Sequence, residues 1–130
     1  MLTPHAGEAA ALLGVERTQV EAERLVHARR LATDTRATVL LKGSSTLVVA
    51  PDGAPALVNP TGTGWLATAG TGDVLSGLTG SLLATGLPAR EAGAVGAYLH
   101  GLAGRYAPRP PAALEIADAL HGAWQDVLKP

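Results

Sequence analysis

The feature that most constrains the fold is the stretch 59–73, whose sequence is NPTGTGWLATAGTGD. Glycine and threonine crowd together there without the apolar period of a helix or a strand, so the stretch is predicted to be a loop. Apolar residues recur at helical spacing directly after it, from Val74 to Ala84. The fold must therefore place an irregular, glycine-rich loop at the start of a helix.

Short aliphatic runs precede this loop. They predict strands over Val39–Leu41, Thr46–Ala50 and Pro55–Val58, with a turn at Pro51-Asp52-Gly53 between the last two. The runs are apolar on both faces, and helical segments surround them. We therefore expect an α/β fold with a partial, mostly parallel sheet flanked by helices.

The helical segments are predicted from apolar spacing and from end signals. Thr18 and Glu21 are spaced as a capping box, and Gly14 is placed as a C-cap. The expected helices cover Glu8–Leu13, Thr18–Thr33 with the stripe Val20, Leu25, Val26 and Leu31, Val74–Ala84, the segment from Pro88 to Tyr106, and Ala113–Leu128.

Glycines inside the helix after the loop need an explanation, because each costs about 1 kcal/mol relative to Ala. We interpret Gly77 and Gly80 as allowing close packing on a sheet. The chain shows no internal repeat or linker composition, so residues 1–130 are predicted to form one domain.

Charge and composition exclude several classes of protein. Ten Lys and Arg against eleven Asp and Glu give a net charge of −1, which provides no basic surface for nucleic acid or anionic lipid. No apolar run is long enough to cross a membrane, and no secretory signal opens the chain, so a cytoplasmic location is expected. Without cysteine there is no thiolate nucleophile, and no metal site is predicted.

The chemistry is expected where the loop enters the helix. The backbone N–H groups of Gly70, Thr71 and Gly72 can converge there, and the positive end of the helix dipole favours an anion such as a phosphoryl group. Asp73 would then accept a proton from an attacking hydroxyl. The alternative is that Asp73 is only the N-cap of the helix.

Two standard nucleotide motifs do not account for the loop. Neither Gly64 nor Gly72 is followed by lysine, so this is not a P-loop. Gly62, Gly64 and Ala67 match the dinucleotide-binding fingerprint, but no completed strand precedes them and no acidic residue follows at the right distance. We treat that match as accidental.

Other residues carry weaker signals. Lys42 and Gly43 follow a strand and could hold a nucleotide at the sheet edge, or Lys42 could be an ordinary solvated lysine. His5 lacks a second ligand nearby and is better suited to hydrogen bonding than to metal binding. Trp65 could stack on a base, or it could anchor the loop by burial.

Three blocks of sequence carry a family resemblance. They are LTPHAGEAAALLG at 2–14, VLLKGSSTLVVAPDG at 39–53 and NPTGTGWLATAGTGDVLSGLTGSLLATG at 59–86. In this order and spacing they resemble the ADP-dependent NAD(P)H-hydrate dehydratases of the ribokinase-like superfamily. The chain is similar to the C-terminal half of that domain, so the N-terminal part of the family fold is expected to be missing.

The resemblance implies a repair reaction in which NADH hydrate or NADPH hydrate is returned to NAD(P)H, at the expense of ADP, with release of AMP and phosphate. ADP or ATP would be the phosphoryl donor, accompanied by Mg²⁺ for which no protein ligand can be named. It implies that Asp73 is the catalytic base. It also implies that both Asp73 and His5 contact the substrate. The implied nucleotide-binding residues are Lys42, Gly43, Ser44, Ser45, Thr46 and Gly72, and the implied anion hole is Gly70, Thr71 and Gly72.

The sequence departs from the family pattern at Thr63-Gly64-Trp65, where members commonly have Asn-Pro-Gly. Because central strands of the family sheet are expected to be missing, a homo-oligomer or a complementing N-terminal segment is an expected partner. Two other functions stay open. One is a small-molecule kinase of the same fold, acting on an alcohol such as a hydroxymethylpyrimidine. The other is a catalytically silent fragment that serves as a binding module.

Overall fold

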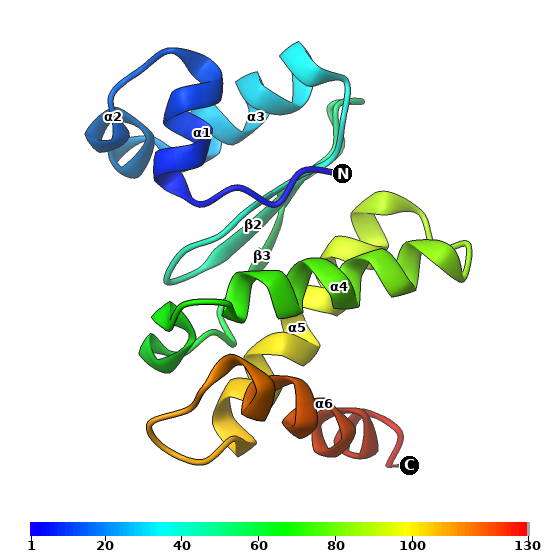
Figure 1. Ribbon diagram of the computed structural model, residues 1–130. Coiled ribbons are helices and arrows are strands. Elements are labelled where there is room, and N and C mark those ends of the chain that lie inside the picture. Colours follow the sequence, from blue (N-terminus) through cyan, green and yellow to red (C-terminus); the bar gives the residue numbers. More distant parts are fainter. Residues whose placement is uncertain (130) are drawn as a thin grey trace. The chain divides into compact units, whose positions relative to one another are not determined.

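The computed structural model describes residues 1–129 and divides the chain into two compact units, Met1–Val58 and Asn59–Pro130. Figure 1 shows the order of the elements along the chain. The first unit contains α1 (Ala6–Leu13), α2 (Arg17–Ala22), α3 (Arg24–Thr35), β1 (Val39–Leu41) and β2 (Thr46–Val49), and β3 (Leu57–Asn59) ends at the boundary. The second contains the 3₁₀ turn η1 (Gly64–Ala67), α4 (Thr71–Ala84), α5 (Ala89–Tyr106) and α6 (Ala113–Val127).

The sheet has the order β1-β2-β3. β1 and β2 are antiparallel, with Val39 opposite Val49 and Leu41 opposite Leu47. Leu2 adds an isolated parallel bridge to Val39. The α/β class is confirmed, but this pair differs in direction from the mostly parallel sheet that was expected. The connection at 42–45 is too short for the crossover that parallel neighbours require.

Aliphatic side chains fill the interior of the first unit. α3 packs against β1 and β2, and every residue of β1 is buried. The cluster contains no aromatic residue, in keeping with a chain that has no Phe. Its buried members are Ala9, Ala10, Leu13, Val20, Ala28, Leu31, Ala32, Val39, Leu41, Leu47 and Val49.

The single helix predicted over Thr18–Thr33 is wrong. The helix breaks at Glu23, whose backbone has φ −131° and ψ 55°, so α2 and α3 are separate. The predicted capping box is wrong as well, because the helix begins one residue before Thr18. The bond at this end runs instead from the Glu16 N–H to the Gln19 Oε1, at 2.9 Å.

The break resets the helical phase, which changes the buried face of α3. Leu25 and Val26 were expected to be buried but are exposed at 42% and 58%. His27 is buried in their place and lies 3.0 Å, at Nδ1, from the carbonyl oxygen of Glu23. The predicted stripe therefore holds only for Val20 and Leu31.

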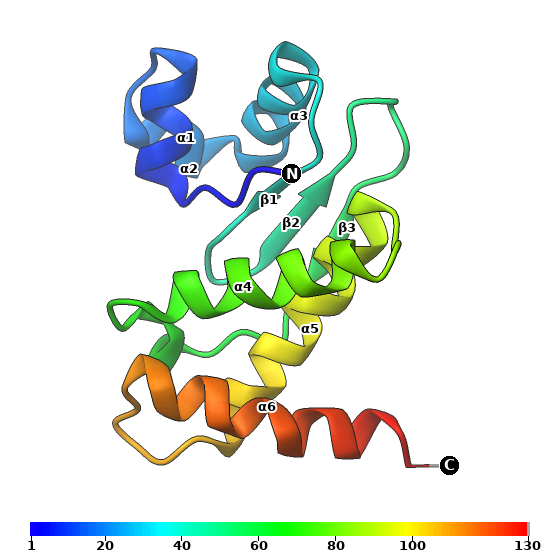
Figure 2. The ribbon, with the colours of Figure 1, turned by 45° about the vertical axis from the view of Figure 1, so that its right-hand side comes forward.

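In the second unit α5 packs against both α4 and α6, as Figure 2 shows. One buried cluster of this unit contains Leu99, Ala103, Ala107, Ile116 and Ala123. Leu75, Leu82, Ala92 and Ala97 are buried as well. Leu114 and Leu128, two apolar residues of the helix predicted over Ala113–Leu128, are exposed at 78% and 70%. Within residues 1–129, no helix is both long enough and apolar enough to span a membrane.

Within the second unit, the glycines that permit close packing lie in α5. A Cβ added at Gly77 or Gly80 of α4 would meet no atom within 4 Å among the described residues. The expected packing of these two glycines on a sheet involves strands of the first unit and stays a prediction. Gly96 lies against Thr79, Gly101 against Thr61, and Gly104 against Leu66.

Candidate functional site

The glycine- and threonine-rich loop is fixed to α5 by buried hydrogen bonds. The Asn59 Nδ2 donates to the carbonyl oxygen of Ala97 at 2.9 Å. The Thr61 hydroxyl donates to the Asn59 Oδ1 at 3.0 Å and lies 3.3 Å from the carbonyl oxygen of Tyr98. Arg105 Nε donates to the carbonyl oxygen of Thr61 at 3.3 Å. The irregular start of the loop is therefore held by α5.

The end of the loop is held by Thr71, the first residue of α4. Its buried hydroxyl donates to the carbonyl oxygen of Leu66 at 2.6 Å and lies 2.9 Å from that of Thr68. Its backbone N–H also donates to the carbonyl oxygen of Thr68, at 3.3 Å. These bonds start the helix at Thr71, three residues before the predicted start at Val74.

Gly70 is the N-cap of α4, with φ +85°, a left-handed conformation that glycine adopts without the penalty of a Cβ. Its carbonyl oxygen accepts the N–H groups of Asp73 and Val74, at 3.1 and 3.2 Å. Among residues 1–129, the N–H groups of Gly70 and Gly72 have no acceptor.

The predicted anion hole therefore has fewer available N–H donors than expected. The Thr71 N–H is occupied by the chain itself, whereas the N–H groups of Gly70 and Gly72 are unoccupied. Unsatisfied N–H groups at a helix start, together with the positive end of the helix dipole, favour an anion.

The Asp73 carboxylate does not cap the helix. The N-cap is Gly70, and Asp73 lies in the first turn of α4 without a side-chain capping bond. The residue is exposed and its carboxylate has no bonded partner in the described part of the chain. The alternative that Asp73 is only an N-cap is therefore wrong. The free carboxylate belongs to the same first helical turn as the N–H groups without an acceptor, and a free carboxylate can accept a proton.

In the first unit His5 is the N-cap of α1. Its Nδ1 accepts the Glu8 N–H at 3.1 Å, and its own N–H donates to the Glu8 Oε2 at 2.7 Å. Accepting that bond requires the Nδ1 lone pair, so the ring proton lies on Nε2, which is 3.5 Å from the Glu8 Oε1 in a largely exposed side chain. One ring nitrogen of this predicted substrate contact is therefore used by the helix.

Glu8 connects two predicted site residues. The Lys42 Nζ lies 3.6 Å from the Glu8 Oε2, the same oxygen that accepts the His5 N–H. That backbone hydrogen bond is the main cause that lowers the pKa of the Glu8 carboxyl. Partial burial opposes it, and the positive charge of Lys42 adds to the lowering. His5 and Lys42 are thus brought together through a carboxylate.

The rest of the predicted nucleotide-binding segment follows β1. Gly43 and Ser44 are exposed, Ser45 is half-buried, and Thr46 is the first residue of β2. Arg24 Nη2 donates to the carbonyl oxygens of Leu41 and Lys42, both at 3.2 Å. The guanidinium fills the space that a side chain at Gly43 would need.

Several positioning residues escaped the sequence reasoning. The sequence predicted no role for Glu8, which lies inside the first block that carries the family resemblance, and none for Asn59, Thr61 or Arg24. The Asn59-Pro60-Thr61 string is a visible signal, but its partners lie on a helix 37 and 38 residues further along.

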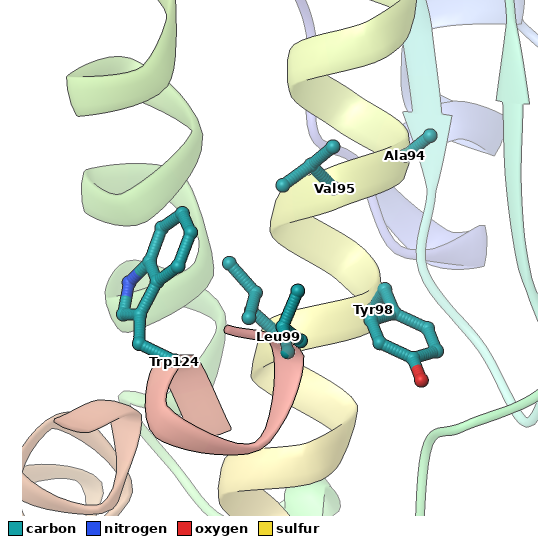
Figure 3. Close-up of a pocket in the computed structure, with 6 residues that line it drawn as sticks. Ala94, Val95, Tyr98, Leu99 and Trp124 are labelled. Atoms are coloured by element: carbon teal, nitrogen blue, oxygen red, sulfur yellow. The ribbon is translucent and has the colours of Figure 1, made fainter. Parts of the chain in front are cut away.

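One pocket of the second unit is apolar, and none of the predicted site residues lines it. Figure 3 shows Ala94, Val95, Tyr98 and Leu99 on α5 and Trp124 on α6 around it. Its volume is about 280 Å³. Among residues 1–129, no three His, Asp or Glu side chains gather as a metal site would require.

Comparison with known proteins shows the family of the chain. The sequence model of NAD(P)H-hydrate dehydratase matches residues 1–122. The ADP-dependent (S)-NAD(P)H-hydrate dehydratase of Neisseria meningitidis is 52% identical over 79% of this chain and 34% of its own length. The bifunctional NAD(P)H-hydrate repair enzyme of Moorella thermoacetica is 47% identical over 84% of this chain and 20% of its own.

Solved structures support the fold. An ADP/ATP-dependent NAD(P)H-hydrate dehydratase from Bacillus subtilis, co-crystallised with ATP and Mg²⁺, matches with a TM-score of 0.87 at 32% identity. The match covers 96% of this chain and 47% of that one. A ribokinase-like superfamily protein from Enterococcus faecalis matches with a TM-score of 0.76 at 27% identity, over 99% of this chain and 45% of its own. The chain thus spans from about a fifth to about half of these relatives, and it belongs to the NAD(P)H-hydrate dehydratase family.

Proposed function

We propose that this chain takes part in the ADP-dependent dehydration of NADH hydrate or NADPH hydrate to NAD(P)H, with release of AMP and phosphate. The observation that carries the proposal is the free Asp73 carboxylate in the first turn of α4, beside N–H groups of Gly70 and Gly72 that have no acceptor among the described residues. The names of the relatives support the choice of substrate and donor.

In the proposed reaction the ring hydroxyl of the hydrate attacks the terminal phosphorus of ADP, and Asp73 accepts the hydroxyl proton. The bond between this phosphorus and the AMP oxygen breaks, so that AMP leaves. The phosphorylated hydroxyl then departs as phosphate, expelled by the lone pair of the ring nitrogen, and loss of a proton from the neighbouring ring carbon restores the dihydropyridine.

The N–H groups at the start of α4 would hold the oxygens of the transferring phosphoryl group. Among the three residues of the predicted anion hole, we assign this role to Gly70 and Gly72. The buried hydroxyl of Thr71 instead fixes the start of the helix. Since these donors are preformed, little reorganisation accompanies the transfer.

The segment from Lys42 to Thr46 is proposed to bind the nucleotide, with Lys42 leaving Glu8 to meet a phosphate. For His5, whose side chain is exposed, the Nε2–H is the ring donor we propose for hydrogen bonding to the hydrate, in place of its approach to the Glu8 Oε1 at 3.5 Å. A phosphate can compete for the lysine because the ion pair at 3.6 Å is partly exposed and therefore weak.

Magnesium would neutralise the phosphates of the donor. This chain's described residues do not offer a cluster of three ligands for it, so we assign no protein ligand and no step to the metal. We further propose that both units belong to one domain, and that a complementing N-terminal segment or a second copy of the chain completes it.

The proposal is tested with the full chain, prepared NADH hydrate and ADP, by following the return of the absorbance of the reduced nicotinamide ring. We expect Asp73→Asn to lower kcat by roughly 10²- to 10⁴-fold. Its folding should be unchanged, because the carboxylate has no bonded partner among residues 1–129. Asp118→Asn, which alters another exposed helical aspartate, is the matched control. No ADP-dependent return of absorbance with the parent chain would contradict the proposal.

A further inference from the structure

The sequence left two roles open for Trp65, stacking on a ring or anchoring the loop. The structure assigns the anchoring role to its neighbour. Leu66 lies against Gly104 of α5, so close that a Cβ at this glycine would stand 2.8 Å from the Leu66 Cδ2. Trp65 itself is 42% exposed, which is inconsistent with anchoring by burial.

The backbone that carries Trp65 is well fixed. The Thr68 hydroxyl donates to the carbonyl oxygen of Trp65 at 3.0 Å, and the Leu66 N–H donates to that of Thr63 at 3.0 Å. The carbonyl oxygen of Leu66 accepts the Thr71 hydroxyl at 2.6 Å. The residue after Trp65 is thereby bonded directly to the first residue of α4, where the unoccupied N–H groups lie.

An exposed indole on a fixed turn is suited to stacking. Tryptophan offers a large planar face at a low cost in side-chain entropy, and stacking on an aromatic side chain tolerates any planar base. We propose that the indole of Trp65 stacks on the planar ring of a nucleotide whose phosphate is held at the start of α4. This inference rests on the proposed function, in which the phosphoryl group at the start of α4 passes from one ring-bearing nucleotide, ADP, to another, the nicotinamide nucleotide.

The other tryptophan provides a matched control. The chain has two, and Trp124 lies in α6 against the apolar core and lines the pocket of Figure 3. The tryptophan fluorescence of the Trp124→Phe variant therefore comes from Trp65 alone, and that of Trp65→Phe comes from Trp124 alone.

Intrinsic fluorescence tests the stacking with four probes: ADP, nicotinamide mononucleotide, ribose 5-phosphate and inorganic phosphate. In Trp124→Phe we expect at least one of the two ring-bearing probes to quench the emission, and the two ringless probes to leave it unchanged. The ring-bearing probe that quenches identifies which nucleotide stacks. In Trp65→Phe we expect no quenching by any probe.

Affinity is measured separately by calorimetry. Trp65→Leu should weaken binding of the stacking nucleotide by roughly 5- to 150-fold, and Trp65→Tyr should restore most of it. Tyr98→Leu, which removes another exposed aromatic ring, should change nothing. Circular dichroism melting shows whether each variant is folded, and Trp65→Tyr carries the comparison if Trp65→Leu is not.

The outcomes separate this inference from the proposed function. Turnover without quenching, or equal nucleotide affinity in Trp65→Leu and the parent chain, overturns the stacking alone. Ring-dependent quenching without turnover supports the stacking and contradicts the dehydratase. If neither ring-bearing probe binds, the stacking is overturned, whatever the turnover.

Discussion

The two predicted sites differ in whether their polar groups already have hydrogen-bond or ion-pair partners within the chain. In the first unit, His5 caps α1 and Lys42 is paired with Glu8. In the second, the Asp73 carboxylate and the Gly72 N–H have no partner among residues 1–129. A ligand at the first must displace existing contacts, whereas a ligand at the start of α4 meets groups that are already available.

The largest effect is expected from disturbing the support of the second site. Gly101→Ala should lower the free energy of unfolding by about 1–3 kcal/mol, because the new Cβ would overlap the Thr61 hydroxyl and stand 2.8 Å from its backbone carbonyl carbon. Chemical denaturation measures the change.

Gly77→Ala is the control with the opposite sign. The space around that position is open, so replacing a helical glycine there should stabilise the chain by up to about 1 kcal/mol. Equal changes in the free energy of unfolding for the two substitutions would show that α5 does not pack tightly against the loop. The second site would then not be held rigidly by α5.

A smaller effect is expected at the cap of α1. His5→Ala should cost about 1 kcal/mol, because the Glu8 N–H loses its acceptor, and His5→Asn should restore most of this stability. If His5 also binds the hydrate through Nε2, His5→Asn should still have a raised KM. Full recovery of both stability and KM in that variant would reduce His5 to a cap.

Local patterns in the sequence predicted much of this fold. The end of α1 at Gly14, the strands at 39–41 and 46–49 and the long helices α5 and α6 follow from spacing and end residues over short windows. The position of the candidate site, where the loop enters α4, follows from the glycines themselves.

What could not be predicted depends on distant contacts. The helix break at Glu23 changes the buried face from Val26 to His27, although the spacing favours one continuous helix. The hydrogen bond from Asn59 to Ala97 joins residues far apart in the sequence, and no local pattern specifies it. Asp73 could be an N-cap only if α4 began at Val74. The hydrogen bonds of Thr71 start the helix at Thr71 instead, so the N-cap is Gly70.

A further test concerns a buried hydroxyl in the loop. The Thr63 Oγ1 is buried and has no hydrogen-bond partner within residues 1–129. Thr63→Val should therefore stabilise the chain by about 0.5–1 kcal/mol, because it removes a desolvated polar atom at nearly constant shape. Thermal melting provides the measurement, and a loss of stability would mean that the hydroxyl has a partner in solution.

The smallest effect concerns the pairing of Glu8. The pKa of its carboxyl is lowered in the folded chain, chiefly by the His5 N–H and also by Lys42. The folded form therefore binds the acidic proton less readily than the unfolded chain, and this stabilisation is present above the unfolded pKa, about 4.3. It is lost as the pH falls through the lower folded value.

Because Glu8 is half exposed, we expect only a few tenths of a kcal/mol from its pairing with Lys42. Urea unfolding of the parent chain, Glu8→Gln, Lys42→Met and the double variant gives the coupling energy at pH 7 and at a pH where an NMR titration shows the Glu8 carboxyl to be protonated in the folded chain. A coupling that persists once this carboxyl is protonated would mean that the carboxylate charge does not hold Lys42, and that this lysine is as available to a phosphate as the groups at the start of α4.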